Sequence, residues 1–181
     1  MIFFVRHGET DYNAEARCMG WADKPLNDNG ILQAEELAEK LKDVNFLKIF
    51  CSPLLRAKQT AEIVNRCHNV PIEFVDELKE RYCGTRQGVC YKDLSKEDDI
   101  DFFKNPEKYG AESDKDFFDR CVKAFKIVQN TGEENVLIVS HGGTFRAICC
   151  YILNTFDPDD SIWRLKNCEI AKIDKDKITK I

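Results

Sequence analysis

Short apolar segments alternate with amphipathic stretches along this chain, and the alternation restricts its fold more than any other feature. The apolar segments predict buried strands at residues 2–6, 46–51, 71–75 and 136–140. Apolar positions at helical spacing predict helices over residues 29–41, 114–129 and 144–153, and one from Ser52-Pro53 to about Asn65. From Ile162 to the end we expect strands around a turn at residues 174–177.

Strands that alternate with helices predict an α/β fold. We expect a three-layer sandwich, in which helices cover both faces of a mostly parallel central sheet. The chain has 181 residues, 43% of them hydrophobic, which suits one core and a single domain over residues 1–181. The aromatic and charged stretch at about residues 82–112 is predicted to form a small cap on that domain.

Charge and cysteine content narrow the class of protein further. The net charge is −5 and the acidic residues are scattered, so we expect no nucleic-acid partner. The apolar run at residues 2–5 is too short for a signal sequence, and no run is long enough to span a membrane. Nine cysteines without a C-x-x-C pair favour reduced thiols and a cytoplasmic location. The sequence predicts no oligomeric state.

Candidate functional residues follow the predicted strands. Arg6, His7 and Gly8 end the first strand, Ser52-Pro53 leads to Arg56, and His141, Gly142 and Gly143 follow the strand at residues 136–140. Ligands of open α/β sheets bind beyond the carboxyl ends of the strands, so these side chains are expected to converge. The third histidine, His68, lies in a helix-to-strand connection and is not expected to join them.

Two imidazoles and two guanidiniums in one place suit a tetrahedral dianion, which predicts a phosphate site. The arginines disfavour protonation of His7, which makes its neutral imidazole the predicted nucleophile. Arg6 and Arg56 are expected to hold the nonbridging oxygens, and His141, protonated beside the phosphate, to stabilise the transferring group. Glu80 is the predicted proton donor to the leaving group, with Glu9 as a weaker candidate, and Asn13 could add a neutral donor.

Three blocks of sequence carry a family resemblance, and they occur in that family's order. They are residues 5–10 (Val-Arg-His-Gly-Glu-Thr), residues 52–61 around Arg56, and residues 140–143 (Ser-His-Gly-Gly). With further matches between the blocks, the chain resembles the histidine phosphatase (phosphoglycerate mutase-like) superfamily over nearly its whole length. The resemblance implies that His7 is phosphorylated, that Arg6, Arg56 and His141 complete the phosphate site, and that Glu80 is the proton donor. It also implies that Asn13 contributes to binding and that no metal or organic cofactor takes part.

The substrate is expected to be a small phosphate monoester, with Arg81 and Gly142 as further binding residues. The alternative is a cofactor-dependent phosphoglycerate mutase, which resembles this chain in the same active-site residues. The segment from Gly88 to Gly110 is much shorter than the insertion of those mutases and lacks their paired arginine, which favours hydrolysis. A phosphate-relay or non-catalytic regulatory protein is a second alternative. A zinc hydrolase is a third, disfavoured because the histidines lack metal-ligand spacing.

Overall fold

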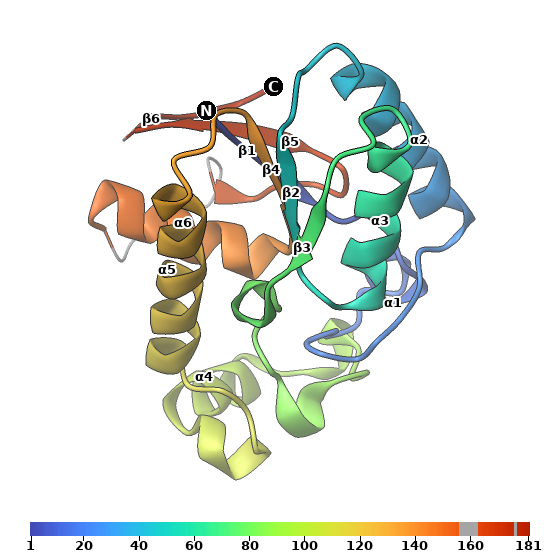
Figure 1. Ribbon diagram of the computed structural model, residues 1–181. Helices are drawn as coiled ribbons and strands as arrows, with labels where there is room; N and C mark the ends of the chain where they lie inside the picture. Colours follow the sequence, from blue (N-terminus) through green and yellow to red (C-terminus); the bar gives the residue numbers. More distant parts are fainter. Residues whose placement is uncertain (156–162, 176) are drawn as a thin grey trace.

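The computed structural model describes residues 1–155, 163–175 and 177–181, and its centre is a six-stranded sheet (Figure 1). The strand order is β3-β2-β4-β1-β5-β6. The strands are β1 (Ile2–Arg6), β2 (Lys48–Cys51), β3 (Ile72–Phe74), β4 (Val136–Ser140), β5 (Ile170–Asp174) and β6 (Lys177–Lys180). The pairs β3-β2, β2-β4 and β4-β1 are parallel, whereas β5 and β6 add an antiparallel edge. The predicted mostly parallel sheet is therefore confirmed.

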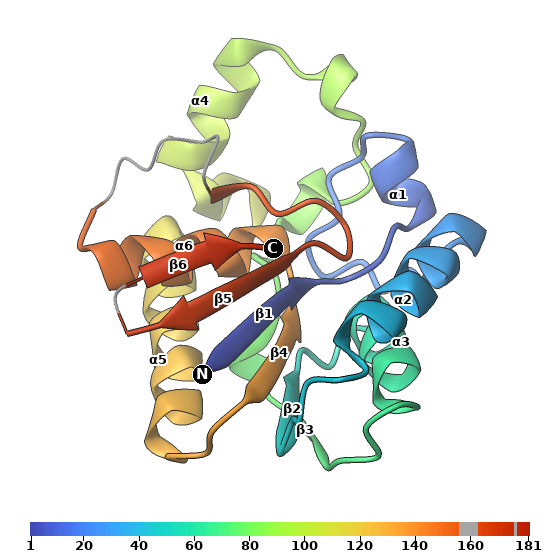
Figure 2. The same cartoon turned by 90° about the horizontal axis from the view of Figure 1, so that it is seen from above.

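Two helices cover each face of the sheet, as expected for a three-layer sandwich (Figures 1 and 2). On one face lie α2 (Asp28–Leu41) and α3 (Leu55–Asn65), and on the other α5 (Asp114–Asn130) and α6 (Gly142–Leu153). Side chains of β1 alternate between the layers: Phe3 and Val5 pack toward α2 and α3, and Phe4 packs toward Phe145 of α6. Because both faces are buried, β4 is buried along its whole length, and it is apolar from Val136 to Val139 rather than alternating.

Residues 82–112, which we name the cap segment, contain one α-helix and three short 3₁₀ turns. They are η2 (Gly84–Arg86), η3 (Tyr91–Asp93), α4 (Lys96–Lys104) and η4 (Pro106–Tyr109). The segment lies beyond the end of the sheet at which β1 and β4 finish (Figures 1 and 2). An antiparallel bridge between Arg17 and Cys90 joins it to the chain that follows α1 (Asp11–Ala14). Another 3₁₀ turn, η1 (Asp76–Leu78), precedes the segment.

Some predicted boundaries were wrong. The helix expected from Ser52-Pro53 begins at Leu55, where the Asp23 carboxylate accepts the Leu55 N–H at 2.6 Å. The last strands begin at Ile170, later than the predicted Ile162, which lies outside the described residues, as does Asp176 of the predicted turn. Neither α1 nor α4 was predicted; α4 begins with a reciprocal cap between Ser95 and Asp98.

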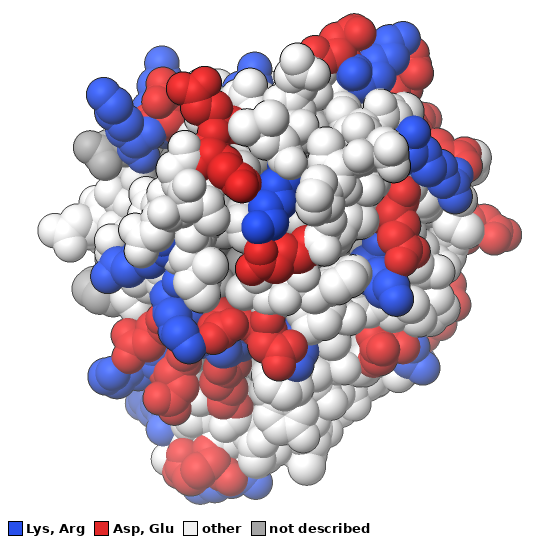
Figure 3. All heavy atoms as spheres, in the orientation of Figure 1, with Lys and Arg blue, Asp and Glu red and all other residues white. Residues whose placement is uncertain are grey.

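Acidic and basic side chains are interspersed over the face seen in Figure 3. Within the described residues, every helix is too short or too polar to cross a lipid bilayer.

Close packing of backbone against backbone joins the start of α2 to the loop that follows β1. A Cβ on Gly30 would lie 2.0 Å from the Glu9 carbonyl oxygen, and one on Gly8 would lie 2.5 Å from the Gly30 carbonyl oxygen. Neither contact can be relieved by moving a flexible side chain, so only glycine fits at both positions.

We predict that Gly30→Ala lowers the free energy of unfolding by about 1–3 kcal/mol, because the added methyl group forces the two backbone segments apart. Urea denaturation measures the change. Asn29→Ala, at the exposed neighbouring position, is the matched control and should stay within about 0.5 kcal/mol of wild type. Equal stabilities of the two variants would contradict the packing argument.

Candidate active site

All four parallel strands deliver a candidate residue to one end of the sheet. His7 directly follows β1, His141 follows β4, and Arg56 lies in the first turn of α3 after β2. Glu80 follows β3 and η1. The His7 and His141 ring centroids are 5.2 Å apart, and the Arg56 Nε is 3.1 Å from the His7 Nε2. The structure therefore brings together the histidines and the arginine that the sequence singled out.

Hydrogen bonds define the tautomer of His7. Its Nδ1 lies 2.7 Å from the carbonyl oxygen of Gly8, which only accepts, so Nδ1 carries the proton. The Nε2 accepts from the Arg56 Nε–H at 3.1 Å, so its lone pair points away from the backbone and toward the shared site. The Asn167 amide also donates to the His7 carbonyl at 2.9 Å and so holds the loop that follows β1. His7 is thus oriented with an unprotonated nitrogen available for bonding.

Arg56 is almost fully buried, at 1% exposure, and its guanidinium is held on three sides. Besides His7 it donates to the carbonyl oxygens of Gly20 at 2.8 Å and Ala22 at 3.1 Å. Burial lowers the pKa of Arg56 to about 10, while the nearby charge of Glu80 acts in the opposite direction. Burial, followed by the charges of Arg56 and Arg6, holds the pKa of His7 well below its ordinary value. The predicted effect of the arginines on His7 is reproduced by this geometry.

His141 is fully buried and forms the N-cap residue of α6. Its Nε2 lies 2.7 Å from the Ser52 hydroxyl, and its Nδ1 is a buried polar atom without a partner in the described part of the chain. Burial, followed by the charges of Arg56 and Arg6, holds the pKa of His141 well below its ordinary value. The protonated His141 expected from the sequence therefore requires the negative charge of a bound phosphate to offset these effects.

Arg6 completes the cationic side of the site. Its Nη1 donates to the Leu165 carbonyl at 2.9 Å, whereas its Nε is buried without a partner among the described residues. Gly142, at the start of α6, lies against the Arg6 side chain, whose Cδ would be 3.7 Å from a Cβ at this glycine. Asn13 is connected more loosely, since its Oδ1 accepts at 3.3 Å from the same Asn167 amide that contacts the His7 backbone.

The Glu80 carboxylate is tied to the N-terminus of α6. Its Oε2 accepts from the Gly143 N–H at 3.0 Å, and its Oε1 accepts from the Arg81 N–H at 2.8 Å. A Cβ on Gly143 would lie 2.2 Å from Oε1, so a glycine is needed for the carboxylate to approach the helix. The alternative acid Glu9 instead accepts from the Asn27 amide at 3.0 Å, at the start of α2.

Arg81 and His68 lie apart from these residues. The Arg81 guanidinium contacts Asp114 at 2.5 Å and the Glu112 carbonyl at 2.9 Å, and it stacks on Phe102 and Phe103. These contacts direct it into the cap segment, which favours a structural role over the predicted role in substrate binding. The His68 ring packs against Phe46, with ring centroids 4.9 Å apart.

Sequence reasoning missed several residues that support the site. Ser52 bonds His141, the Thr60 hydroxyl accepts from the Gly8 N–H at 3.0 Å, and Asn167 links the His7 and Asn13 loops. Ser52 and Thr60 lie in a block that the family resemblance already marked, so closer attention to its hydroxyls could have found them. Asn167 is remote in sequence from both partners, and no local pattern indicates it. In the part of the chain that is described, no three His, Cys, Asp or Glu side chains gather as metal ligands.

Comparison with known proteins identifies the family. The model of the histidine phosphatase superfamily (branch 1) matches residues 2–179, so the chain belongs to that superfamily. It is 36% identical over 174 residues to the "Uncharacterized phosphatase PhoE" of Bacillus subtilis, covering 96% of this chain and 87% of that one. It is also 30% identical over 180 residues to the "Probable phosphoglycerate mutase GpmB" of Salmonella paratyphi A, covering 96% and 84%.

Comparison with solved structures supports the same family. The crystal structure of the alpha-ribazole phosphatase from Shigella flexneri superposes with a TM-score of 0.81 at 27% sequence identity, covering 99% of this chain and 94% of that one. The phosphoglycerate mutase-like fold expected from the resemblance is therefore confirmed. The phosphatase relatives support the predicted enzyme class, a phosphoric monoester hydrolase.

We predict that His7 stays neutral, with Nδ1 protonated, as the pH falls through 6.5. Burial and the two arginines lower its pKa, so the imidazole gains a proton only at lower pH. Two-dimensional ¹⁵N NMR of the histidine rings reports the tautomer and the titration midpoint. Arg56→Gln should move the midpoint of His7 upward, because it removes a neighbouring positive charge. A wild-type midpoint at or above 6.5 would contradict this account.

Proposed function

We propose that the protein hydrolyses small phosphate monoesters through a phosphohistidine on His7, with Glu80 as the proton donor. The observation that carries the proposal is the orientation of His7, whose Nδ1–H is bound to Gly8 and whose Nε2 lone pair faces Arg56 and the second histidine. A nucleophile at phosphorus needs an unprotonated nitrogen with such a lone pair, and the transferring phosphoryl group needs the surrounding cations.

In the first step, Nε2 of His7 attacks phosphorus and the P–O bond to the leaving group breaks. Glu80 gives its proton to the departing oxygen, so an alcohol leaves and a carboxylate remains. Arg6, Arg56 and His141 bind the nonbridging oxygens, where charge is spread in the transition state. The Arg6 Nε and the His141 Nδ1, which have no hydrogen-bond partner among the described residues, are donors suited to those oxygens. Arg56 exchanges its contact with the His7 Nε2 for one with the phosphoryl group.

In the second step, water attacks the phosphorus and the P–N bond breaks, which returns the lone pair to the His7 Nε2. The Glu80 carboxylate accepts a proton from the attacking water and is ready for another cycle. No metal ion is required, because side chains supply the charge neutralisation and His7 supplies the nucleophile. Asn13 is proposed as a neutral contact at the edge of the site.

The mutase alternative has one observation in its favour, the relative named as a phosphoglycerate mutase. A mutase holds a bisphosphorylated intermediate, which needs basic residues free to bind a second phosphate. In the cap segment, however, Arg86 pairs with Asp99 at 2.5 Å, and the adjoining Arg81 pairs with Asp114 at 2.5 Å. These ion pairs support hydrolysis over transfer. A non-catalytic role is less well supported. Binding alone requires no proton donor, so it gives no reason for Glu80 to be present in the site.

The proposal includes a single domain over residues 1–181, on which the cap segment limits access to the site. It also includes a cytoplasmic location, supported by the nine cysteines, all of which are free thiols.

We predict that wild type releases inorganic phosphate from a panel of monoesters in the presence of EDTA and that His7→Ala does not. Loss of the nucleophile removes the covalent pathway, so the rate should fall by at least about 10³-fold. His68→Ala removes a histidine outside the site and is the matched control. Including 3-phosphoglycerate with and without 2,3-bisphosphoglycerate tests the alternative. Isomerisation without phosphate release would identify a mutase, and EDTA-sensitive activity would contradict the metal-free mechanism.

We predict that Glu80→Gln lowers kcat/KM for an alkyl ester such as glycerol phosphate by about 10²-fold or more. For 4-nitrophenyl phosphate, whose leaving group departs unprotonated, the loss should be less than about tenfold. The parameter kcat/KM reports the first phosphoryl transfer, so slower hydrolysis of the phosphoenzyme does not confuse the result. Glu77→Gln, three residues earlier, is the control. Equal losses on both esters would refute the acid assignment.

A further inference from the structure

The segment that carries Glu80 has little regular structure of its own. Residues 79–81 follow η1 and precede the cap segment, and they belong to no helix or strand. Such a segment needs outside contacts to hold a catalytic carboxyl in one place. Four successive backbone carbonyls, from Glu77 to Glu80, all accept hydrogen bonds from side chains of other elements.

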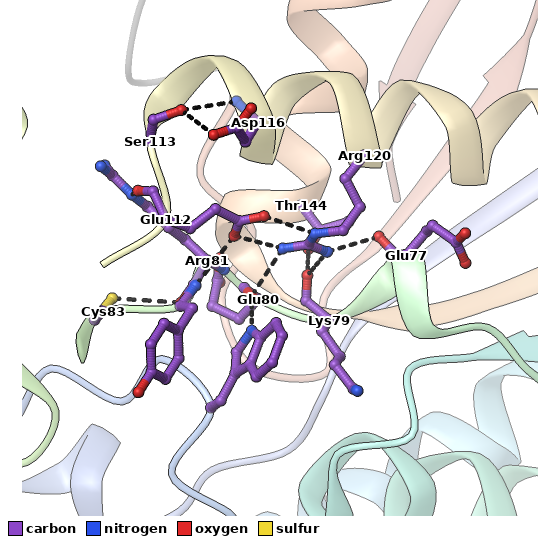
Figure 4. A network of polar contacts seen from close by, with 12 residues as sticks. Glu77, Lys79, Glu80, Arg81, Cys83, Glu112, Ser113, Asp116, Arg120 and Thr144 are labelled. Carbon is purple, nitrogen blue, oxygen red and sulfur yellow. Dashed lines mark hydrogen bonds and ion pairs between the residues drawn. The ribbon is translucent and has the colours of Figure 1, made fainter. Parts of the chain in front are cut away.

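Six side-chain hydrogen bonds reach these four carbonyls, and three of the six come from one guanidinium on α5 (Figure 4). Arg120 donates through Nη1 to the carbonyls of Glu77 and Lys79, each at 2.9 Å, and through Nη2 to the Glu80 carbonyl at 3.2 Å. The Thr144 hydroxyl also donates to the Lys79 carbonyl at 3.2 Å, and the Trp21 indole N–H donates to the Glu80 carbonyl. The Ser140 hydroxyl donates to the remaining carbonyl, that of Leu78, at 2.7 Å. Arg120 therefore spans the segment on both sides of that contact.

Glu112 holds the same guanidinium from the other side. It accepts from the Arg120 Nε at 2.8 Å and Nη2 at 2.7 Å, a two-point contact that defines the plane of the guanidinium. The side chains of Arg120 and Glu112 are only 17% and 15% exposed. Burial alone would lower the pKa of Arg120, but the bonds and charge of Glu112 raise it. Glu112 also accepts from the Tyr82 N–H at 3.2 Å, which extends the support past Glu80.

We infer that Arg120, oriented by Glu112, is a positioning residue that places the Glu80 carboxyl for proton transfer to the leaving group. The inference rests on the proposed function, in which Glu80 is the acid. Arg120 bonds the backbone of Glu80, and the carboxyl itself is held by Gly143. Loss of the guanidinium removes three of the six side-chain hydrogen bonds that hold this backbone while leaving His7 and its cations intact, so proton donation suffers and phosphate binding does not.

The test compares Arg120→Met with wild type on glycerol phosphate and 4-nitrophenyl phosphate. We expect kcat/KM to fall by roughly ten- to a hundredfold for glycerol phosphate, because a misplaced acid is inefficient. It should fall by less than about threefold for 4-nitrophenyl phosphate, and vanadate inhibition should be unchanged. Lys123→Met is the matched control, since this exposed lysine on the same helix contacts the Glu77 side chain and no backbone carbonyl of the segment. A merely structural role would lower activity on both esters and weaken vanadate binding, which would overturn the inference.

A double-mutant cycle separates this inference from the proposed function. In the Glu80→Gln background, Arg120→Met should cause no further loss on glycerol phosphate, because the group it positions is gone. Additive losses would overturn the positioning role while leaving Glu80 as the acid. If Glu80→Gln shows no dependence on the leaving group, both the acid assignment and the inference fail. If Arg120→Met does not fold, Glu112→Gln is the second variant, because it keeps the side-chain shape. It is expected to give the same selective loss on glycerol phosphate, at a smaller magnitude. Equal losses on the two esters would overturn the inference.

Discussion

The contact between the Arg56 guanidinium and the His7 imidazole is the interaction on which the rest of the site depends. Both side chains are buried, and a positive charge 3.1 Å from Nε2 keeps that nitrogen unprotonated and oriented. Burying a guanidinium is unfavourable unless its donors are satisfied, and the Gly20 and Ala22 carbonyls satisfy them. The loop at residues 18–23 thus holds the Arg56 guanidinium in its place beside His7.

The sheet determines which groups can meet. Adjacent parallel strands end side by side, so His7 and His141 are neighbours because β1 pairs with β4. Arg56 and Glu80 arrive from β2 and β3 through short connections. Each connection is then held by contacts outside the sheet, such as Gly30 against the β1 loop and Arg120 against the β3 loop. The strands give the approximate positions, and these contacts give the orientation that catalysis requires.

Sequence alone could predict the parts of the molecule that local pattern determines. The buried strands β1 and β4, the amphipathic helices α2 and α5, and the two histidines after strand ends follow from apolar periodicity and turn residues. The start of α3 could not be predicted, because its cap comes from Asp23 in a distant loop. Arg81 was predicted to face the substrate, yet Asp114 and two aromatic rings hold it elsewhere. The role of Arg120 could not be predicted, because its partners are backbone carbonyls, which every residue has and which no sequence pattern distinguishes.

The proposed mechanism requires that phosphate is transferred to His7 before it reaches water. Rapid mixing of the enzyme with an excess of 4-nitrophenyl phosphate, an alkaline quench and peptide mapping by mass spectrometry would locate any phosphoryl group, and ³¹P NMR would identify the nitrogen that carries it. We expect one phosphoryl group per chain on Nε2 of His7, formed within the first turnover. A phosphoryl group on another residue, or steady release of phosphate with unmodified His7 throughout, would contradict it.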